Sequence, residues 1–183
     1  MNIEPGAEEI DRAAFKEVWA RAAPLVREGF ASSARPDQEM SVVFSPTADG
    51  ADYREFYPGG DVVDLVALDA YGQRWGSTTP EEQELLDLVA GQLRDFAAFG
   101  EEVGKPVALA EWANVAVQPG QPEGMQGVGD EPAYVELVAA WAREHDAAYL
   151  VYFNSPEGGV GQTLADTPES LEALVAASGE QAP

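Results

Sequence analysis

A single carboxylate at the end of a short apolar strand is the residue of this chain best suited to chemistry. Glu111 closes the stretch Lys105-Pro-Val-Ala-Leu-Ala-Glu-Trp112, in which the apolar residues predict a strand over 107–110. In parallel α/β barrels the catalytic residues lie at the C-terminal ends of the strands. Glu111 is therefore a candidate catalytic group. The competing interpretation is a polar residue at a strand end that only hydrogen-bonds to its neighbours.

The composition removes several classes of function. The chain of 183 residues has 33 acidic and 10 basic side chains, for a net charge of −23, which would repel nucleic acid and anionic membranes. It has no cysteine and its one histidine is His145, so disulfides, thiolate sites and histidine metal clusters are excluded. Its glycines follow no phosphate-loop or dinucleotide pattern. We expect no metal and no cofactor, and a structural role for His145 at a helix end.

Strands alternate with amphipathic helices along the chain, and this alternation is typical of parallel βαβ units. The strands are expected at 40–44, 62–69, 107–110 and 149–153, and the helices at 11–28, 79–99, 130–144 and 167–177. The sequence thus predicts an α/β fold with about four parallel strands and flanking helices. We expect one domain over residues 1–177 and a frayed tail over 178–183.

The first helix carries its own signals. Asp11 is the expected N-cap, and a 3–4 residue spacing predicts an inward face made of Phe15, Val18, Ala22 and Leu25. Pro24 is expected to kink this helix or end it early, because proline cannot donate the backbone hydrogen bond of a helix interior.

Four segments in order resemble glycoside hydrolase family 26, the β-mannanase-like barrels. Residues 42–46 are similar to the fifth strand of that family, 57–71 to its sixth strand and lead-in, and 105–111 to its seventh. Gly129-Asp-Glu-Pro-Ala-Tyr134 with Trp141, followed by 149–154, resembles the seventh helix and eighth strand. The similarity runs from about Phe15 to Leu174. It implies a truncated (β/α)8 barrel, the C-terminal half only.

The resemblance also implies roles for particular residues. Glu111 matches the nucleophile of a retaining mechanism, and Tyr71 matches an aromatic residue close to that carboxylate. Trp75, Trp112 and Tyr152 are candidates to stack on a sugar. Each of these aromatic residues could equally serve as core or interface material.

The second carboxyl of a retaining glycosidase has no counterpart in the sequence. The family takes its acid/base from strand four, typically in a His-Glu-Met context, and Glu39-Met40 echoes that dipeptide but enters a strand rather than leaving it. Without an acid, a nucleophile loses a contribution of roughly 10²–10⁴-fold. Four parallel strands also leave two open edges, near Val43 and Val151, which invite another protein chain.

Three functions follow from this pattern. The first is a glycoside-hydrolase-like domain that binds carbohydrate or is inert. The second is a structural or decoration subunit of a large assembly such as a virus particle. The third is a retaining endo-β-mannanase-type enzyme completed by another chain. The sequence shows no signal peptide, which predicts synthesis in the cytoplasm and suits a particle released by lysis.

Overall fold

The computed structural model of the protein describes residues 11–33, 38–48, 52–76, 82–116, 124–155 and 163–179. Within this part of the chain, no helix has the length and apolarity needed to cross a membrane. The expected frayed tail lies mostly outside the described residues, although the last helix includes Ser178 and Gly179.

Four parallel strands form the main sheet, as the sequence predicts. Their order across the sheet is β1 (Val43–Phe44), β2 (Leu65–Trp75), β3 (Val107–Asn114) and β5 (Leu150–Tyr152). Among the described strands, β1 pairs only with β2 and β5 only with β3, so each has one unpaired edge. The sheet is thus a partial barrel wall with two open edges.

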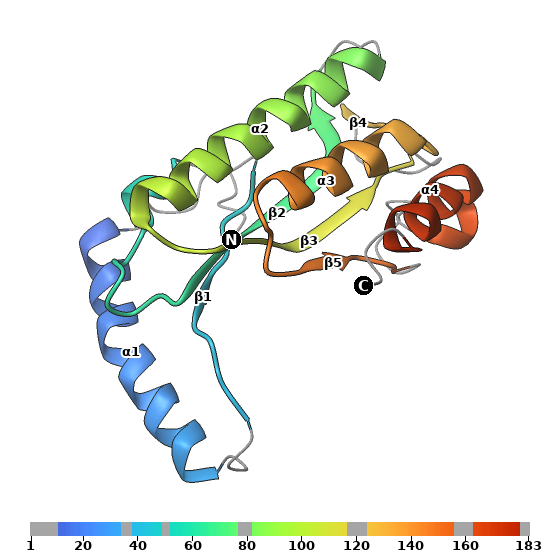
Figure 1. Ribbon diagram of the computed structural model, residues 1–183. Helices are drawn as coiled ribbons and strands as arrows, with labels where there is room; N and C mark the ends of the chain where they lie inside the picture. The colour runs from blue at the N-terminus through green and yellow to red at the C-terminus, as the bar shows by residue number, and fades with distance from the viewer. Residues whose placement is uncertain are drawn as a thin grey trace.

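Helices cover one face of this sheet (Figure 1). α2 (Glu82–Val103) and α3 (Pro132–Glu144) lie across it, and α4 (Pro168–Gly179) packs beside α3. Their buried side chains meet alternate residues of β2, which are Val66, Leu68 and Ala70. The sequence periodicity predicts inward faces made of Leu85, Leu86, Val89, Leu93 and Phe96 in α2 and of Val135, Val138 and Trp141 in α3. All of these are buried except Leu86, which is partly buried against the core.

α1 (Arg12–Ser33) departs from its prediction in two ways. The Asp11 cap is confirmed, since its carboxylate accepts hydrogen bonds from the amides of Ala13 at 2.8 Å and Ala14 at 3.2 Å. Pro24, however, lies inside a continuous helix. Tertiary anchoring on both sides of the proline explains this: Trp19 packs on Phe44, and further along Arg27 bonds Asp64 at 2.5 Å.

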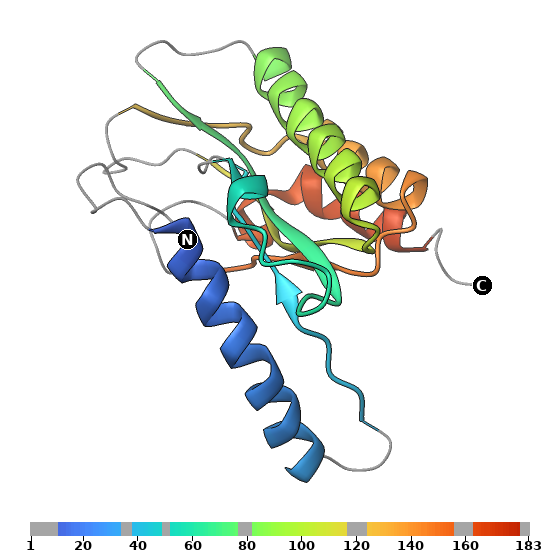
Figure 2. The ribbon, with the colours of Figure 1, turned by 90° about the vertical axis from the view of Figure 1, so that its left-hand side faces the viewer.

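The apolar face of α1 is also different from the expected one. Phe15, Trp19 and Ala23 pack inward, whereas Val18 is 63% exposed and Leu25 is 67% exposed. Figures 1 and 2 show the reason, because the helix extends beyond the sheet and its outer side meets no described element. The helical period was predicted correctly, but the direction of the buried side was wrong.

A short strand that the sequence did not predict lies in the glycine-rich loop. β4 (Met125–Gly127) runs antiparallel to the end of β2, with Trp75 opposite Met125. Gly127 makes this possible, because a Cβ there would lie 2.0 Å from the carbonyl oxygen of Val115. The remaining residues of that loop, 117–123, lie outside the described part.

The ends of α3 and α4 are fixed by neighbouring carboxylates. Glu131 accepts a hydrogen bond from the amide of Ala133 and caps α3. Asp130 accepts hydrogen bonds from the amides of Glu169 and Ser170, so this carboxylate caps the start of α4. Buried Asn114, at the end of β3, donates to the carbonyls of Gly129 and Glu131 and to the Ser170 hydroxyl. The end of β3 is thereby tied to the starts of both helices.

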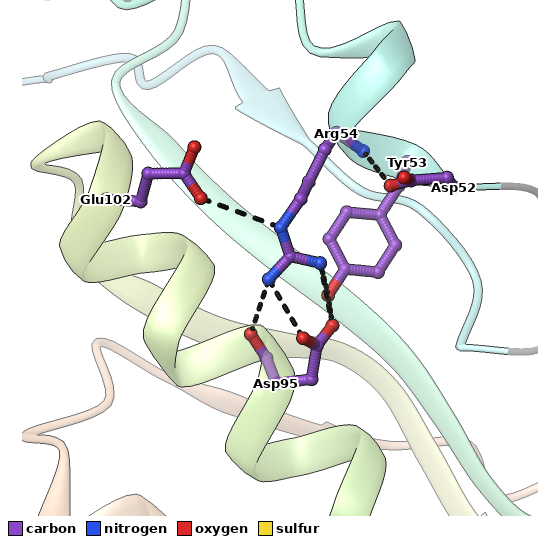
Figure 3. Close-up of polar contacts among 5 residues, drawn as sticks. All are labelled: Asp52, Tyr53, Arg54, Asp95 and Glu102. Atoms are coloured by element: carbon purple, nitrogen blue, oxygen red, sulfur yellow. Dashed lines mark hydrogen bonds and ion pairs between the residues drawn. The ribbon is translucent and has the colours of Figure 1, made fainter.

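A short 3-10 helix, η1 (Tyr53–Phe56), stands where a full helix would connect β1 to β2, and Arg54 fastens it to α2 (Figure 3). The guanidinium donates to both carboxylate oxygens of Asp95, at 2.8 and 2.9 Å, and lies 3.6 Å from the carboxylate of Glu102. It also lies over the rings of Tyr53 and Phe99. A second 3-10 helix, η2 (Leu164–Asp166), precedes α4.

Candidate functional site

A bulge in β3 turns Glu111 toward the side of the sheet opposite the helices. β2 and β3 pair Leu68 with Leu109 and then Asp69 with Glu111, so Ala110 is the extra residue. Without it, strict alternation from buried Leu109 would direct Glu111 into the helix-covered core. With it, Glu111 shares a face with Asp69. Glu111 lies near the end of its strand, as predicted. The bulge then directs its carboxylate to the face of the sheet that the helices leave uncovered.

Tyr71 orients this carboxylate from the neighbouring strand. Its hydroxyl donates a hydrogen bond to Oε2 of Glu111. Burial, followed by that hydrogen bond, raises the pKa of Tyr71 well above its ordinary value, so the phenol remains a donor. The ring of Phe153, 6.2 Å away and nearly perpendicular, supports the Tyr71 ring. The structure thus brings together the two residues that the resemblance links.

Asp69 is a member of this group that sequence reasoning did not select. It pairs with Glu111 across the strands and accepts a hydrogen bond from the Ser45 hydroxyl at 3.1 Å. Burial raises the pKa of Asp69 to about 6, and the charge of Glu111 adds to the rise, while the Ser45 hydroxyl opposes it. The signal available in the sequence was the spacing of Asp69 and Tyr71, which places both on one face of a strand.

The other predicted aromatic residues are not all in this group. Trp75 lies at the far end of β2 and is 54% exposed, on the strand that carries Tyr71. Trp112 is only 2% exposed and packs in the helix-side core against Tyr134 and Tyr152. The bulge explains the separation, because Trp112 points away from the face that carries Glu111. Neither Trp112 nor Tyr152 is brought to the carboxylate.

Two further carboxylates, Asp64 and Glu39, lie near strand starts and have structural positions. Asp64 accepts hydrogen bonds from the amide of Val42 and from the Arg27 guanidinium. It therefore ties the residue before β1 to the second half of α1. The pKa of Asp64 is lowered, chiefly by the Val42 amide and then by Arg27. Glu39 precedes β1, at the opposite end of the strand from the site, as the sequence predicts. The described residues contain no cluster of His, Cys, Asp and Glu that could hold a metal ion.

The arrangement can perform one half of a displacement at a sugar carbon. Glu111 is a half-buried carboxylate held by a neutral phenol, as a nucleophile requires. A retaining glycosidase also needs a second carboxyl about 5–5.5 Å away that acts as acid and then base. The described sheet ends at β1 and β5, so no described strand faces Glu111 across a closed ring.

Comparison with known proteins agrees with this geometry. The profile of glycosyl hydrolase family 26 matches residues 33–109, which covers β1, β2, α2 and the first part of β3 and ends just before Glu111. No curated protein sequence matches the chain.

Solved structures match the chain over nearly all of its length. A family GH26 protein from Muricauda, GH26C, matches with a TM-score of 0.59 at 15% identity, covering 94% of this chain and 45% of its own. The GH26 β-mannanase of Bacteroides ovatus gives 0.58 at 18% identity, with 92% and 43% covered. A β-glucuronidase from Faecalibacterium prausnitzii gives 0.61 at 16% identity, with 96% and 30% covered.

These matches show the fold. The chain is a family-26-like stretch with the architecture of a truncated α/β barrel, and it spans less than half the length of the solved proteins that it matches. Because β-mannanase and β-glucuronidase structures match about equally well, the fold by itself does not select the sugar.

Proposed function

We propose that this family-26-like chain carries the nucleophile of a retaining glycoside hydrolase site, and that Glu111 attacks the anomeric carbon of a β-linked, mannan-type sugar. The observation that supports this most is the group of Glu111, Tyr71 and Asp69 at the C-terminal end of two parallel strands. The match to family 26 over β1 and β2 supports the choice of mannan over other β-linked sugars.

In this reaction the chain supplies nucleophilic attack without protonating the leaving group. The Glu111 carboxylate forms a bond to the anomeric carbon as the bond to the leaving oxygen breaks. Tyr71 holds the carboxylate in position through its hydroxyl. The leaving oxygen of mannan departs slowly unless an acid protonates it. A single chain is therefore expected to bind mannan and hardly cleave it. Exposed Trp75 offers the bound chain of sugars an aromatic surface.

An activated substrate separates these two halves of the chemistry. With 2-deoxy-2-fluoro-mannosyl fluoride, departure of the leaving group needs no acid, and the fluorine slows hydrolysis of the product ester. We expect mass spectrometry of the whole chain to show one added glycosyl group, and peptide mapping to place it on Glu111. Glu111→Gln should abolish labelling, whereas Glu136→Gln, an exposed glutamate on α3, should label as the unmodified protein does.

Labelling, followed by a binding measurement, distinguishes the candidate functions. Label on other carboxylates, or unchanged labelling in Glu111→Gln, would contradict a nucleophilic role for Glu111. Tryptophan fluorescence then tests binding: quenching by manno-oligosaccharides that weakens in Trp75→Ala supports a carbohydrate-binding domain. A chain that neither labels nor binds any sugar in a broad panel would favour the structural-subunit alternative.

A further inference from the structure

The exposed apolar side chains of this molecule gather at its two open edges. At one edge α1 exposes Val18, Leu25 and Val26. At the other, β5 and α4 expose Tyr149, Val151, Phe153, Leu171 and Val175. Elsewhere among the described residues only Trp75 and Leu88 are large, apolar and exposed. Such patches mark surfaces that are covered by other protein.

The shapes of the two edges are opposite to one another. α1 projects beyond the sheet (Figure 2). A groove of about 260 Å³ between it and Val42 is lined almost wholly by apolar side chains. At the other edge, a hollow of about 750 Å³ lies between α3, β5 and α4, with Trp112, Leu150 and Leu174 in its lining. One edge therefore offers a protruding apolar helix, and the other offers a space that could receive one.

The charges of the two edges are opposite as well. α1 has four basic residues, Arg12, Lys16, Arg21 and Arg27, and two acidic ones, Glu17 and Glu28. α4 has Glu169 and Glu172 and no basic residue. In a chain with a net charge of −23, α1 is thus the less acidic of the two edges, although Arg12, Arg21 and Arg27 already pair with Glu55, Glu17 and Asp64. It would be attracted to the α4 edge of another molecule rather than to a second α1.

The number and direction of the strands match this pairing. All four strands of the main sheet are parallel, and β1 and β5 are its two edges. A two-fold axis that runs in the direction of the barrel axis keeps the strand direction the same in both molecules. It would place β5 of each molecule beside β1 of the other, in parallel, at two equivalent seams. Eight parallel strands are the number that closes an α/β barrel.

We propose that two copies of this chain close one barrel, with α1 of each copy seated against α4 and β5 of the other. The second copy also completes the site, which is where this inference rests on the function proposed above. Glu111 and the partner's Glu111 then stand at the same end of the ring, four strands apart. The partner's Glu111 is the second carboxyl that the chemistry requires.

The completed reaction balances with these two groups. As Glu111 bonds to the anomeric carbon and the glycosidic bond breaks, the protonated partner's Glu111 gives its proton to the leaving oxygen. Water then attacks the glycosyl ester and gives a proton to the partner's Glu111, releasing Glu111 as a carboxylate. Two like carboxyls that share a site hold one proton between them more readily than they lose both.

The native mass of the full chain tests the assembly. The chain has a mass of 19.5 kDa, so light scattering coupled to gel filtration should give twice that value. Measurements at 0.15 M and 0.5 M NaCl allow for the strong net negative charge. We expect Val151→Lys and Leu25→Glu to weaken dimerisation by at least 100-fold. Leu88→Lys, on α2 and away from both edges, is the matched control and should leave the dimer intact.

A cross-linking experiment tests the seam itself. The 183 residues contain no cysteine, so Ser41→Cys beside β1 and Val151→Cys on β5 can each be introduced alone. A short bismaleimide should link the two variants when they are mixed and should link neither variant to itself. A well-folded monomer at all concentrations and both salt levels would overturn the proposal. A dimer in which Val151→Cys links to itself would overturn it equally.

The assembly and the chemistry can fail separately. If the dimer and its seam are found but Glu111 takes no label from the activated fluoride, the nucleophile assignment fails and the assembly stands. If Glu111 is labelled but mannan is cleaved equally by the monomeric Val151→Lys variant, the second copy is not the source of the acid. Both proposals together predict that Val151→Lys keeps the labelling and loses the cleavage of mannan.

Discussion

Tyr71 and Glu111 lie on adjacent parallel strands and are joined by a hydrogen bond from the phenol to the carboxylate. The phenol belongs to β2 and the carboxylate to a bulged position of β3, so their contact depends on the register between the strands. This contact makes Glu111 a positioned group rather than a free surface acid.

Removal of the Tyr71 hydroxyl should slow the chemistry at Glu111 more than it affects folding. A hydrogen bond to a charged group contributes about 1.5–3 kcal/mol, which corresponds to roughly 10–100-fold in rate. We expect Tyr71→Phe to label with the fluorosugar more slowly by about that factor. Tyr57→Phe, which removes a buried hydroxyl in the helix-side core, is the control. Equal labelling rates in Tyr71→Phe and the unmodified protein would show that the hydrogen bond does not orient the nucleophile.

Asp69 should make stability depend on pH in a defined direction. Its pKa is about 6 in the folded chain, against 3.8 for an ordinary aspartate. The folded state therefore favours the protonated form, so this residue supports stability below pH 4 and that support is lost as the pH rises through 6. Asp69→Asn keeps an oxygen for Ser45 and does not titrate.

We expect Asp69→Asn to gain stability relative to the unmodified protein between pH 4 and pH 7, by about 1 kcal/mol after allowance for partial exposure. Urea unfolding at several pH values measures this difference. Asp166→Asn, on exposed η2, provides the baseline for loss of one negative charge. If the stability advantage of Asp69→Asn became smaller as the pH rises, the pKa of Asp69 would be lowered by folding rather than raised.

Arg54 should be poorly replaced by lysine. Its planar guanidinium bonds both oxygens of Asp95 and lies over two aromatic rings, and the point charge of lysine reproduces neither interaction. Arg54→Lys should lower the free energy of unfolding by about 1–2 kcal/mol, less at high salt because Asp95 is half exposed. Arg94→Lys, on an exposed turn of the same helix, should change it little. Equal effects of the two substitutions in thermal melts would contradict this account of η1.

Asn114 should be among the least replaceable polar residues of the fold. Its amide, fully buried, donates to two carbonyls and the Ser170 hydroxyl, and alanine would leave those acceptors without their donor. Asn114→Ala should cost about 2–3 kcal/mol of stability. Ser170→Ala removes one of the three bonds and should cost less. Chemical unfolding of the two variants gives the comparison, and a larger loss in Ser170→Ala would assign the anchor to the serine.

The sequence predicted the elements of this fold well, because each long element has a strong period. The capping signal before α1 and the alternation of apolar strands with amphipathic helices led to the order of strands and helices. It could not predict which side of α1 is buried, since Val18 and Trp19 are both apolar and only tertiary contacts decide between them. No residue pattern in the sequence predicts β4, because this strand depends on the absence of a Cβ at Gly127.

The candidate site was predicted in part for a similar reason. Glu111 could be found because it ends an apolar strand, and Tyr71 because the resemblance to family 26 implies an aromatic residue close to that carboxylate. Asp69 was not selected, since its pairing with Glu111 depends on the register shift between the strands, which the sequence does not reveal. Trp112 was expected to stack on a sugar, but it follows Glu111 directly in β3 and therefore faces the opposite side of the sheet.

Because of the bulge at Ala110, the direction of the Glu111 carboxylate depends on the number of residues between Leu109 and Glu111. It does not depend on the type of those residues. Deletion of Ala110 would leave every candidate site residue in the sequence, yet it would rotate Glu111 into the apolar layer and Trp112 out of it. Any survey that judges whether a relative of this chain is catalytically competent should therefore count residues between Leu109 and the glutamate before it looks for the glutamate itself.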